Sequence, residues 1–347
     1  MRILYAIQGT GNGHLSRALD IVPLLQQRAE RVDVLVSGPP ADIELPFSVR
    51  YRCHGLGFVF GKKGGINFVK TFWQLNSKAF LRELRDLPVE MYDLVISDFE
   101  PVSAWACRRR GVPCVALSHQ AAVLSEYAPE PRVPDPVGRA VLRHYAPTTW
   151  QYGFHFQPYE PHIHTPVIRR QVRELTVHHE SHYTVYLPAF DEATLVSRLR
   201  YLSRAVRWEV FSKHSRQESE HGNVRVRPVS GAAFTDSLAR SAGVLCGAGF
   251  ETPAEALYLG KKLLVVPMKQ QYEQACNATA LAHMGVPVVR NLKDKSLAVL
   301  DHWLQYGRPV AVEYPDETAS ILDKLLLEAG RVAGGEAVKG QVADFWV

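Results

Sequence analysis

Short β-rich runs alternate with longer amphipathic runs along this chain, in two separate series. Runs rich in branched and aromatic residues indicate strands, and runs with apolar spacing near 3.6 residues indicate helices. Such alternation is typical of parallel sheets covered by helices. The predicted strands cover residues 2–7, 31–38, 49–56, 92–99 and 112–119 in the first series, and 182–190, 205–214, 223–230, 242–249 and 261–268 in the second.

The amphipathic runs between these strands predict the helices. They cover residues 16–29, 68–87 and 101–111, then 191–202, 231–241, 252–260 and 272–285, with a last helix at 315–330. A proline-rich segment at 128–175 separates the two series and is typical of a connection. We interpret its histidines as part of a surface linker. The alternative is a metal held by the pair His162 and His164.

The sequence therefore predicts an α/β protein with two Rossmann-like, doubly wound parallel-sheet domains that face a cleft. At 347 residues the chain is long enough for two ordinary cores. The predicted N-terminal domain takes residues 1–165 and the C-terminal domain takes 181–330. A linker at 166–180 joins them, and a tail at 331–347 follows.

Composition excludes several classes of protein. No apolar run approaches the roughly 20 residues that span a bilayer, and the first apolar stretch ends too early, at Gln8, for a secretory signal. The five cysteines lack a metal-binding or disulfide-like spacing, so we expect them to be reduced, in a cytoplasmic protein. A net charge of +5 suits anionic substrates and is too small to indicate nucleic-acid binding.

A glycine-rich turn follows the first predicted strand and ends in a histidine. Gly9, Gly11 and Gly13 precede His14, which we place in the first turn of the next helix. The spacing differs from a dinucleotide fingerprint, and no acidic residue ends the second strand, which finishes at Ser37 and a glycine. The turn instead brings backbone N–H groups and His14 to the site-forming edge of the sheet.

A second glycine turn, at Gly247 and Gly249, follows a strand of the second series. Thr252 is the predicted N-cap of the next helix, and Glu255 lies in its first turn. Glu255 could accept hydrogen bonds from two neighbouring hydroxyl groups, although a glutamate there can also simply complement the helix dipole. The polar pair at 273–274 follows the next strand and suits sugar hydroxyls.

These motifs resemble the donor-binding signature of the GT-B glycosyltransferases. The matching positions are Gly247, Gly249, Glu255, Gly260, Pro267, Glu273, Gln274 and Asn277. The sequence is similar in particular to the bacterial N-acetylglucosaminyl transferase of peptidoglycan-precursor synthesis, and to plant and antibiotic-modifying sugar transferases. An uncharacterised bacterial and archaeal branch of this superfamily is closer still. The turn ending in His14 and the stretch "LSHQ" around His119 resemble the N-terminal domains of the same enzymes.

The resemblance implies a nucleotide-sugar donor, with UDP as the expected nucleotide, on the C-terminal domain and an acceptor on the N-terminal domain. No DxD-like motif stands out in the sequence, so we expect no obligate metal or other cofactor. Donor contacts are then expected from Pro188, Phe190, Gly247, Gly249, Phe250, Glu251, Thr252, Glu255, Gln271, Glu273 and Gln274. The acceptor or diphosphate is expected against Gly11, Asn12, Gly13 and His119. The acceptor could be a sugar, a lipid-linked sugar or a small molecule.

The reaction implied is direct displacement at the anomeric carbon, with inversion. A neutral histidine is a suitable general base near neutral pH, and His14 is our candidate. Asp98 or Glu100, in "SDFEP", could orient His14, bind the acceptor or itself be the base. The alternative interpretation of this stretch is an ordinary strand-to-helix turn without a catalytic role. An epimerase on the same fold and a nucleotide-sugar-binding protein without turnover are the alternative functions.

A basic and aromatic stretch at residues 58–75 raises a separate question. The stretch mixes Lys62, Lys63 and Lys70 with apolar residues that include Phe72 and Trp73. A buried helix after a glycine loop is one interpretation. The other is peripheral contact with an anionic membrane or a lipid-linked acceptor.

Overall fold

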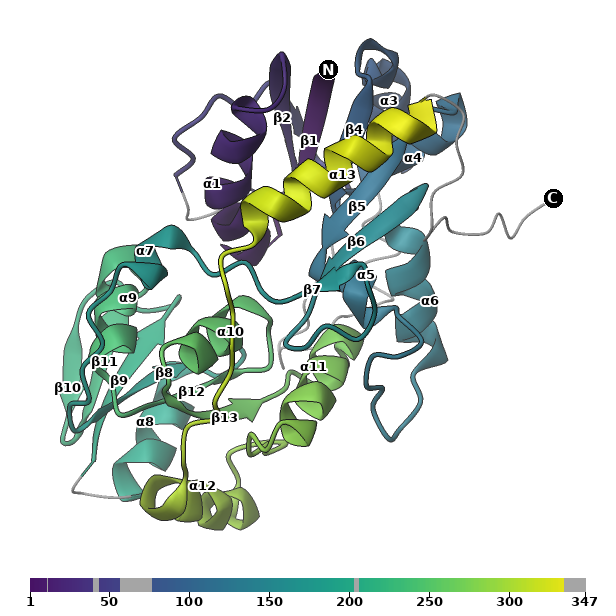
Figure 1. Cartoon of the computed structure of the whole chain (residues 1–347). Helices are drawn as coiled ribbons and strands as arrows, with labels where there is room; N and C mark the ends of the chain where they lie inside the picture. Colours follow the sequence, from purple (N-terminus) through teal and green to yellow (C-terminus); the bar gives the residue numbers. More distant parts are fainter. Residues whose placement is uncertain (11, 40–43, 57–76, 203–205, 334–347) are drawn as a thin grey trace.

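The computed structural model describes residues 1–347 except 11, 40–43, 57–76, 203–205 and 334–347, and holds two sheets, each flanked by helices (Figure 1). The predicted loop residue Gly11 and the predicted membrane-contact stretch at 58–75 lie outside the described residues. Within the described part of the chain, no helix combines the length and apolarity that a membrane span requires.

The first sheet is parallel throughout and has the strand order β3-β2-β1-β4-β5-β6-β7. β1 and β4 are buried along almost their whole length, as expected for parallel strands covered on both faces. The strands are β1 (Arg2–Gln8), β2 (Arg31–Ser37), β3 (Tyr51–Cys53), β4 (Leu94–Asp98), β5 (Cys114–Ser118), β6 (Trp150–Phe154) and β7 (Ile163–His164).

Helices cover this sheet and lead away from its carboxyl edge. α1 begins at Asn12, four residues before the predicted start, so Gly13 and His14 lie in its first turn. The helices described here are α1 (Asn12–Gln26), α3 (Ser77–Asp86), η1 (Val89–Met91, a 3-10 turn), α4 (Pro101–Arg110), α5 (His119–Val123) and α6 (Pro136–Tyr145).

The second sheet has the order β10-β11-β9-β8-β12-β13. Its neighbours pair in parallel, except for the antiparallel pair of β10 and β11. The strands are β8 (His182–Tyr186), β9 (Arg207–Ser212), β10 (Ser219–His221), β11 (Val224–Pro228), β12 (Gly243–Gly247) and β13 (Lys262–Val266). The helices are α7 (Arg170–Arg173), α8 (Glu192–Leu202), α9 (Gly231–Arg240), α10 (Glu251–Tyr258), α11 (Tyr272–His283) and α12 (Asp294–Tyr306).

The proline-rich segment contains two strands, so its interpretation as a surface linker was wrong. Trp150, Tyr152 and Phe154 of β6 are buried in the core, and His155 just after them is fully buried. β6 alternates aromatic and small or polar residues over only five positions. The prolines on both sides are typical of a loop, so the sequence pattern did not predict this short apolar run as a strand.

The last helix, α13 (Thr318–Ala333), returns to the first sheet, although the predicted C-terminal domain extended to residue 330 (Figure 1). Asp323 pairs with Arg28, just after α1, with Oδ1 2.6 Å from Nε. Tyr152 of β6 donates to Glu328 at 2.5 Å. The apolar face of α13 joins the core of the first sheet, which explains why the helix lies there.

Candidate active site

His14 and Asp98 meet at the carboxyl edge of the first sheet. The parallel pairing of β1 with β4 sets Ile7 opposite Asp98, so the glycine turn after β1 lies beside the end of β4. Nδ1 of His14 lies 2.8 Å from Oδ1 of Asp98. Asp98 is fully buried, whereas the His14 side chain is 12% exposed. Two residues singled out from the sequence are therefore in direct contact, with the histidine reachable from solvent.

The charge on Asp98 sets which nitrogen of His14 carries the proton. Burial favours a higher pKa for Asp98, but the nearby Arg17 and His14 outweigh it and hold that pKa below its ordinary value. An ionised carboxylate only accepts hydrogen bonds, so Nδ1 of His14 is the donor. The neutral ring then keeps its lone pair on Nε2. A histidine in this form can accept a proton from a hydroxyl group.

Arg17, one turn after His14 on α1, is a site residue that the sequence reasoning missed. Its side chain is almost fully buried. Nη2 lies 2.7 Å from Oδ1 of Asp98 and Nε lies 3.1 Å from Oδ2, while Nη1 donates to Oε1 of Glu251 at 2.5 Å. A signal was available, because residues three apart share a helix face and Arg17 is basic beside a candidate base.

Glu251 is the first residue of α10 and reaches the first domain from the second. A Cβ atom added at Gly13 would lie 3.0 Å from its Cγ, so the glycine leaves the room that Glu251 occupies. Burial raises the pKa of Glu251 to about 7. Arg17 opposes this rise, and the nearby carboxylates Glu255 and Asp98 add to it.

Glu251→Gln should flatten the pH dependence of stability between about pH 4.5 and 7. Folded Glu251 keeps its proton up to about pH 7, whereas the unfolded chain loses it near the ordinary value of 4.5. The folded state thus binds more protons in this window, and the wild type loses stability as the pH rises through it. Unfolding temperatures across the window measure the effect, with Glu126→Gln as an exposed control. Parallel curves for wild type and Glu251→Gln would contradict the assignment.

Glu255 is buried and held by an arginine of the predicted linker. Nε and Nη2 of Arg169 lie 2.5 Å and 2.8 Å from its two carboxylate oxygens. Each carboxylate oxygen has a second lone pair, so Glu255 can still accept hydrogen bonds from a ligand. The structure thus places Glu255 near the start of α10, as predicted, and pairs it with Arg169.

His119 and Phe250, both predicted as ligand contacts, face each other between the two domains. The two rings stack with centroids 3.9 Å apart and planes 6° apart. Nε2 of His119 lies 2.7 Å from Oδ1 of Asn277, and Nδ1 lies 2.8 Å from the carbonyl oxygen of Phe154. Burial lowers the pKa of His119. Both rings are buried in these contacts and hold the two domains together.

The polar loop and α11 carry the other predicted donor residues. Nε2 of Gln120 donates to Oε2 of Glu273 at 3.1 Å, across the two domains. Gln274 is buried, and its Oε1 accepts from the backbone N–H of Met268 at 2.9 Å, so it supports the loop. Gln271 lies just before α11, and its Oε1 has no hydrogen-bond partner among the described residues.

The remaining predicted residues lie at the ends of β8 and β12. Pro188 follows β8, and Phe190 packs against the core of the second sheet. Gly249 lies in the turn after β12, with open space where a side chain would be. α10 begins at Glu251 with Phe250 as its N-cap, so Thr252 is a helical residue and the predicted N-cap was wrong.

Glu100 has a structural role that replaces its candidate role as a base. It is the N-cap of α4, and its two carboxylate oxygens accept from the backbone N–H groups of Val102 at 2.8 Å and Ser103 at 2.6 Å. The side chain is fully buried. Burial raises its pKa, although these hydrogen bonds act in the opposite direction. We therefore keep Asp98 and discard Glu100.

Phe99, between these two carboxylates, has a backbone conformation that is uncommon outside glycine. Its φ is 58°, in the left-handed region, which costs energy for a side chain of this size. The ring lies roughly parallel to His14, with centroids 6.4 Å apart, and stacks on Tyr145 at 4.7 Å. Such strain is often found at functional sites. Phe99 forms an apolar wall beside the candidate base.

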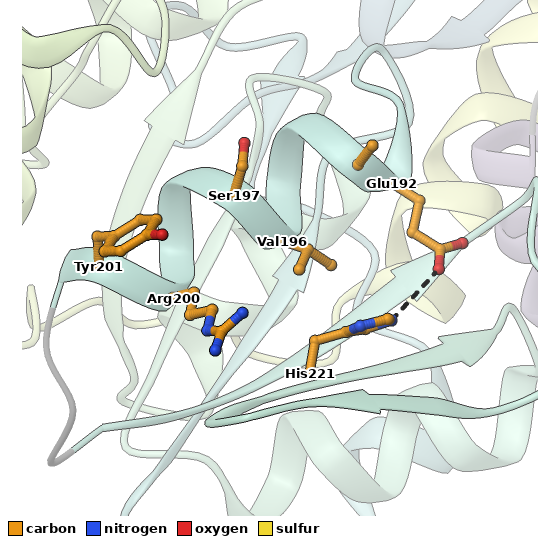
Figure 2. Close-up of a pocket in the computed structure, with 7 residues that line it drawn as sticks. Glu192, Val196, Ser197, Arg200, Tyr201 and His221 are labelled. Carbon is orange, nitrogen blue, oxygen red and sulfur yellow. Dashed lines mark ion pairs between the residues drawn. The ribbon is translucent and has the colours of Figure 1, made fainter.

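A separate hollow lies on the second domain, between α8 and β10 (Figure 2). Its volume is about 510 Å³. His221 and Glu192 form a long contact of 4.0 Å across it. The lining residues are Glu192, Ala193, Val196, Ser197, Arg200, Tyr201 and His221, and none of them belongs to the predicted site. We assign this hollow no part in the candidate site.

Comparisons with known proteins agree with this architecture. A model of the family described as Glycosyl transferase family 1 matches residues 1–306. A UDP-glucosyltransferase from Polygonum tinctorium has a TM-score of 0.57 at 15% identity, over 98% of this chain and 95% of that one. No curated protein sequence matches the chain.

Two further solved structures carry nucleotides. The UGT2 of Phytolacca americana, complexed with UDP-2fluoro-glucose and pterostilbene, has a TM-score of 0.54 at 15% identity, over 96% of this chain and 92% of that one. The glycosyltransferase VinC, in complex with dTDP, has a TM-score of 0.53 at 14% identity, over 97% and 100%. These likenesses confirm the predicted fold of two parallel-sheet domains of the GT-B type.

Proposed function

Because the chain belongs to glycosyl transferase family 1, we propose that it transfers a sugar from a nucleoside diphosphate donor to a hydroxyl acceptor, with His14 as general base. The observation that carries this proposal is the contact of His14 with buried, ionised Asp98. It orients the ring and leaves Nε2 as the proton acceptor. Asp98 is thus a positioning residue in this proposal.

The donor in this proposal binds at the carboxyl edge of the second sheet. The glycine turn after β12 and the start of α10 offer backbone N–H groups to a diphosphate. Glu255, with free lone pairs beside Arg169, would accept from the ribose hydroxyls. We propose a UDP-sugar, which the sequence resemblance supports and which matches the ligand named for the Phytolacca americana structure. No obligate metal or other cofactor is part of the proposal.

The acceptor in this proposal lies beside His14 and the wall formed by Phe99. Nε2 of His14 removes the proton from the acceptor hydroxyl as its oxygen attacks the anomeric carbon. The bond from that carbon to the diphosphate oxygen breaks, and the nucleoside diphosphate leaves with the electron pair. One displacement inverts the anomeric centre. A small-molecule, sugar or lipid-linked alcohol can fill this role.

Glu255→Ala should weaken binding of the UDP-sugar by about 1–3 kcal/mol, or roughly 5–150-fold in Kd. The variant loses the acceptor of the ribose hydroxyls in a buried setting. Isothermal titration calorimetry with UDP-glucose measures the effect. Glu126→Ala, on the exposed surface of the first domain, is the control. An unchanged Kd in Glu255→Ala would remove Glu255 from the donor site.

Release of nucleoside diphosphate tests the function itself. Wild-type protein is incubated with UDP-, GDP- and dTDP-sugars, with and without a panel of alcohol acceptors. Diphosphate release that requires an acceptor, together with a glycosylated product, supports transfer. An isomerised donor without acceptor would instead identify an epimerase, and tight binding without turnover would identify a binding protein.

A further inference from the structure

Arg17 joins the two domains through one buried charge. Its guanidinium binds Asp98, at the end of β4, through Nε and Nη2. The third nitrogen, Nη1, binds Glu251 at the start of α10. A buried arginine is stable only when its charge is paired and its N–H groups have acceptors. Here the ionised Asp98 and the carboxyl group of Glu251, from different domains, supply them.

The sharing matters because Asp98 also holds His14. Nη2 of Arg17 and Nδ1 of His14 both lie within hydrogen-bond distance of Oδ1 of Asp98. An arginine that interacts less with Glu251 would interact more strongly with Asp98, and the carboxylate would then be a weaker acceptor for His14. Charged groups thus face the His14 ring from three elements: Arg17 from α1, Asp98 from β4 and Glu251 from α10.

We propose that Arg17 is a positioning residue that makes the His14–Asp98 pair depend on the second domain. With Glu251 in place, Arg17 donates to both Glu251 and Asp98, and Asp98 remains a strong hydrogen-bond acceptor for Nδ1 of His14. When the second domain is displaced, Arg17 binds Asp98 alone and the pair weakens. The inference rests on the proposed role of His14, and it makes the base effective only when the two domains are together.

The position of Gly13 beside Glu251 also supports this proposal. A side chain at this position would meet Cγ of Glu251, 3.0 Å from the added Cβ. The glycine next to the base is therefore also the position over which the carboxylate of the second domain reaches Arg17. Gly13→Ala disturbs this contact while every charged group stays in the chain.

A titration of the His14 ring tests the proposal. Long-range proton–nitrogen NMR of the full chain without ligand follows both ring nitrogens with pH, and the His14→Gln spectrum assigns them. In Arg17→Met we expect the ring to gain its second proton at a higher pH than in the wild type, since a cation is lost. In Glu251→Ala, and less so in Gly13→Ala, we expect a shift to lower pH, because Arg17 loses the oxygen that accepts from Nη1 and binds Asp98 more strongly.

The opposite signs separate this role from a merely structural one. Arg28→Met removes an arginine just after α1 that pairs on the surface with Asp323, and it should leave the His14 titration unchanged. If Arg17→Met does not fold, Glu251→Ala and Gly13→Ala still carry the test. Shifts of one sign in Arg17→Met and Glu251→Ala, or no shift in Glu251→Ala and Gly13→Ala, would overturn the proposal.

The titration needs no substrate, so its outcome is separable from that of the proposed function. If the variants shift the His14 titration in opposite directions but the protein transfers no sugar, the role of Arg17 stands and the proposed function is refuted. Sugar transfer by a protein without these shifts would keep the function and refute the coupling.

Discussion

His14→Ala lowers kcat by about 10²–10⁴-fold and leaves donor affinity nearly unchanged, as we expect when a general base is removed. The side chain lies on α1 in the first domain, whereas the proposed donor contacts lie on the second. Its loss therefore affects the attacking hydroxyl and not the nucleotide. Steady-state kinetics with the best donor and acceptor pair, and calorimetry with the donor alone, measure the two quantities.

A second histidine of the same domain provides the matched control. His54 has a highly exposed side chain and pairs with Glu83, away from Asp98. His54→Ala should keep kcat within about twofold of the wild type, because it removes no proton acceptor from the site. A kcat of His14→Ala close to that of His54→Ala would remove His14 as the base.

Asp98→Asn should affect both stability and turnover. The substitution leaves Arg17 buried without its main anionic partner, which costs about 3–5 kcal/mol and lowers the unfolding temperature by roughly 4–7 °C. An asparagine can also present its amide group to His14 and favour the wrong tautomer, so kcat should fall by about 10²-fold or more. Thermal unfolding and steady-state kinetics on the folded fraction separate these effects.

The aspartate just before the same strand is the control for Asp98. Asp93 precedes β4 and forms a surface pair with Arg2, with both side chains nearly half exposed. Asp93→Asn should cost no more than about 1 kcal/mol, as exposed ion pairs do. Equal losses of unfolding temperature in Asp98→Asn and Asp93→Asn would refute the role of the buried pair.

Long, regular features of the sequence predicted the fold well. Strands such as β1 and β4 are continuous apolar runs bounded by turn residues, and a run of this kind is read without knowledge of its partners. β6 was not predicted as a strand because it is five residues long and lies among prolines. The position of α13 was not predicted because an apolar helix face does not indicate which of two sheets the helix will cover.

The sequence predicted those parts of the candidate site in which the residue type and its position after a strand indicated a chemical role. His14 and Asp98 follow a strand each and could be placed at one sheet edge from the sequence. Glu100 stands two residues from Asp98, and only the structure shows that its oxygens cap α4. His119 and Phe250 come from different domains, so no local pattern could indicate that their rings would stack on each other.

The return of α13 changes how the two domains are related along the chain. The connection crosses between the sheets twice, and Arg173 of the first crossing donates to the backbone oxygens of Tyr314 and Pro315 in the second. In chain order the second domain is thus an insertion within the first. A ribosome synthesises β1 through β7 early, yet their covering helix emerges only after the whole inserted domain. The half that holds the base is begun first and completed last.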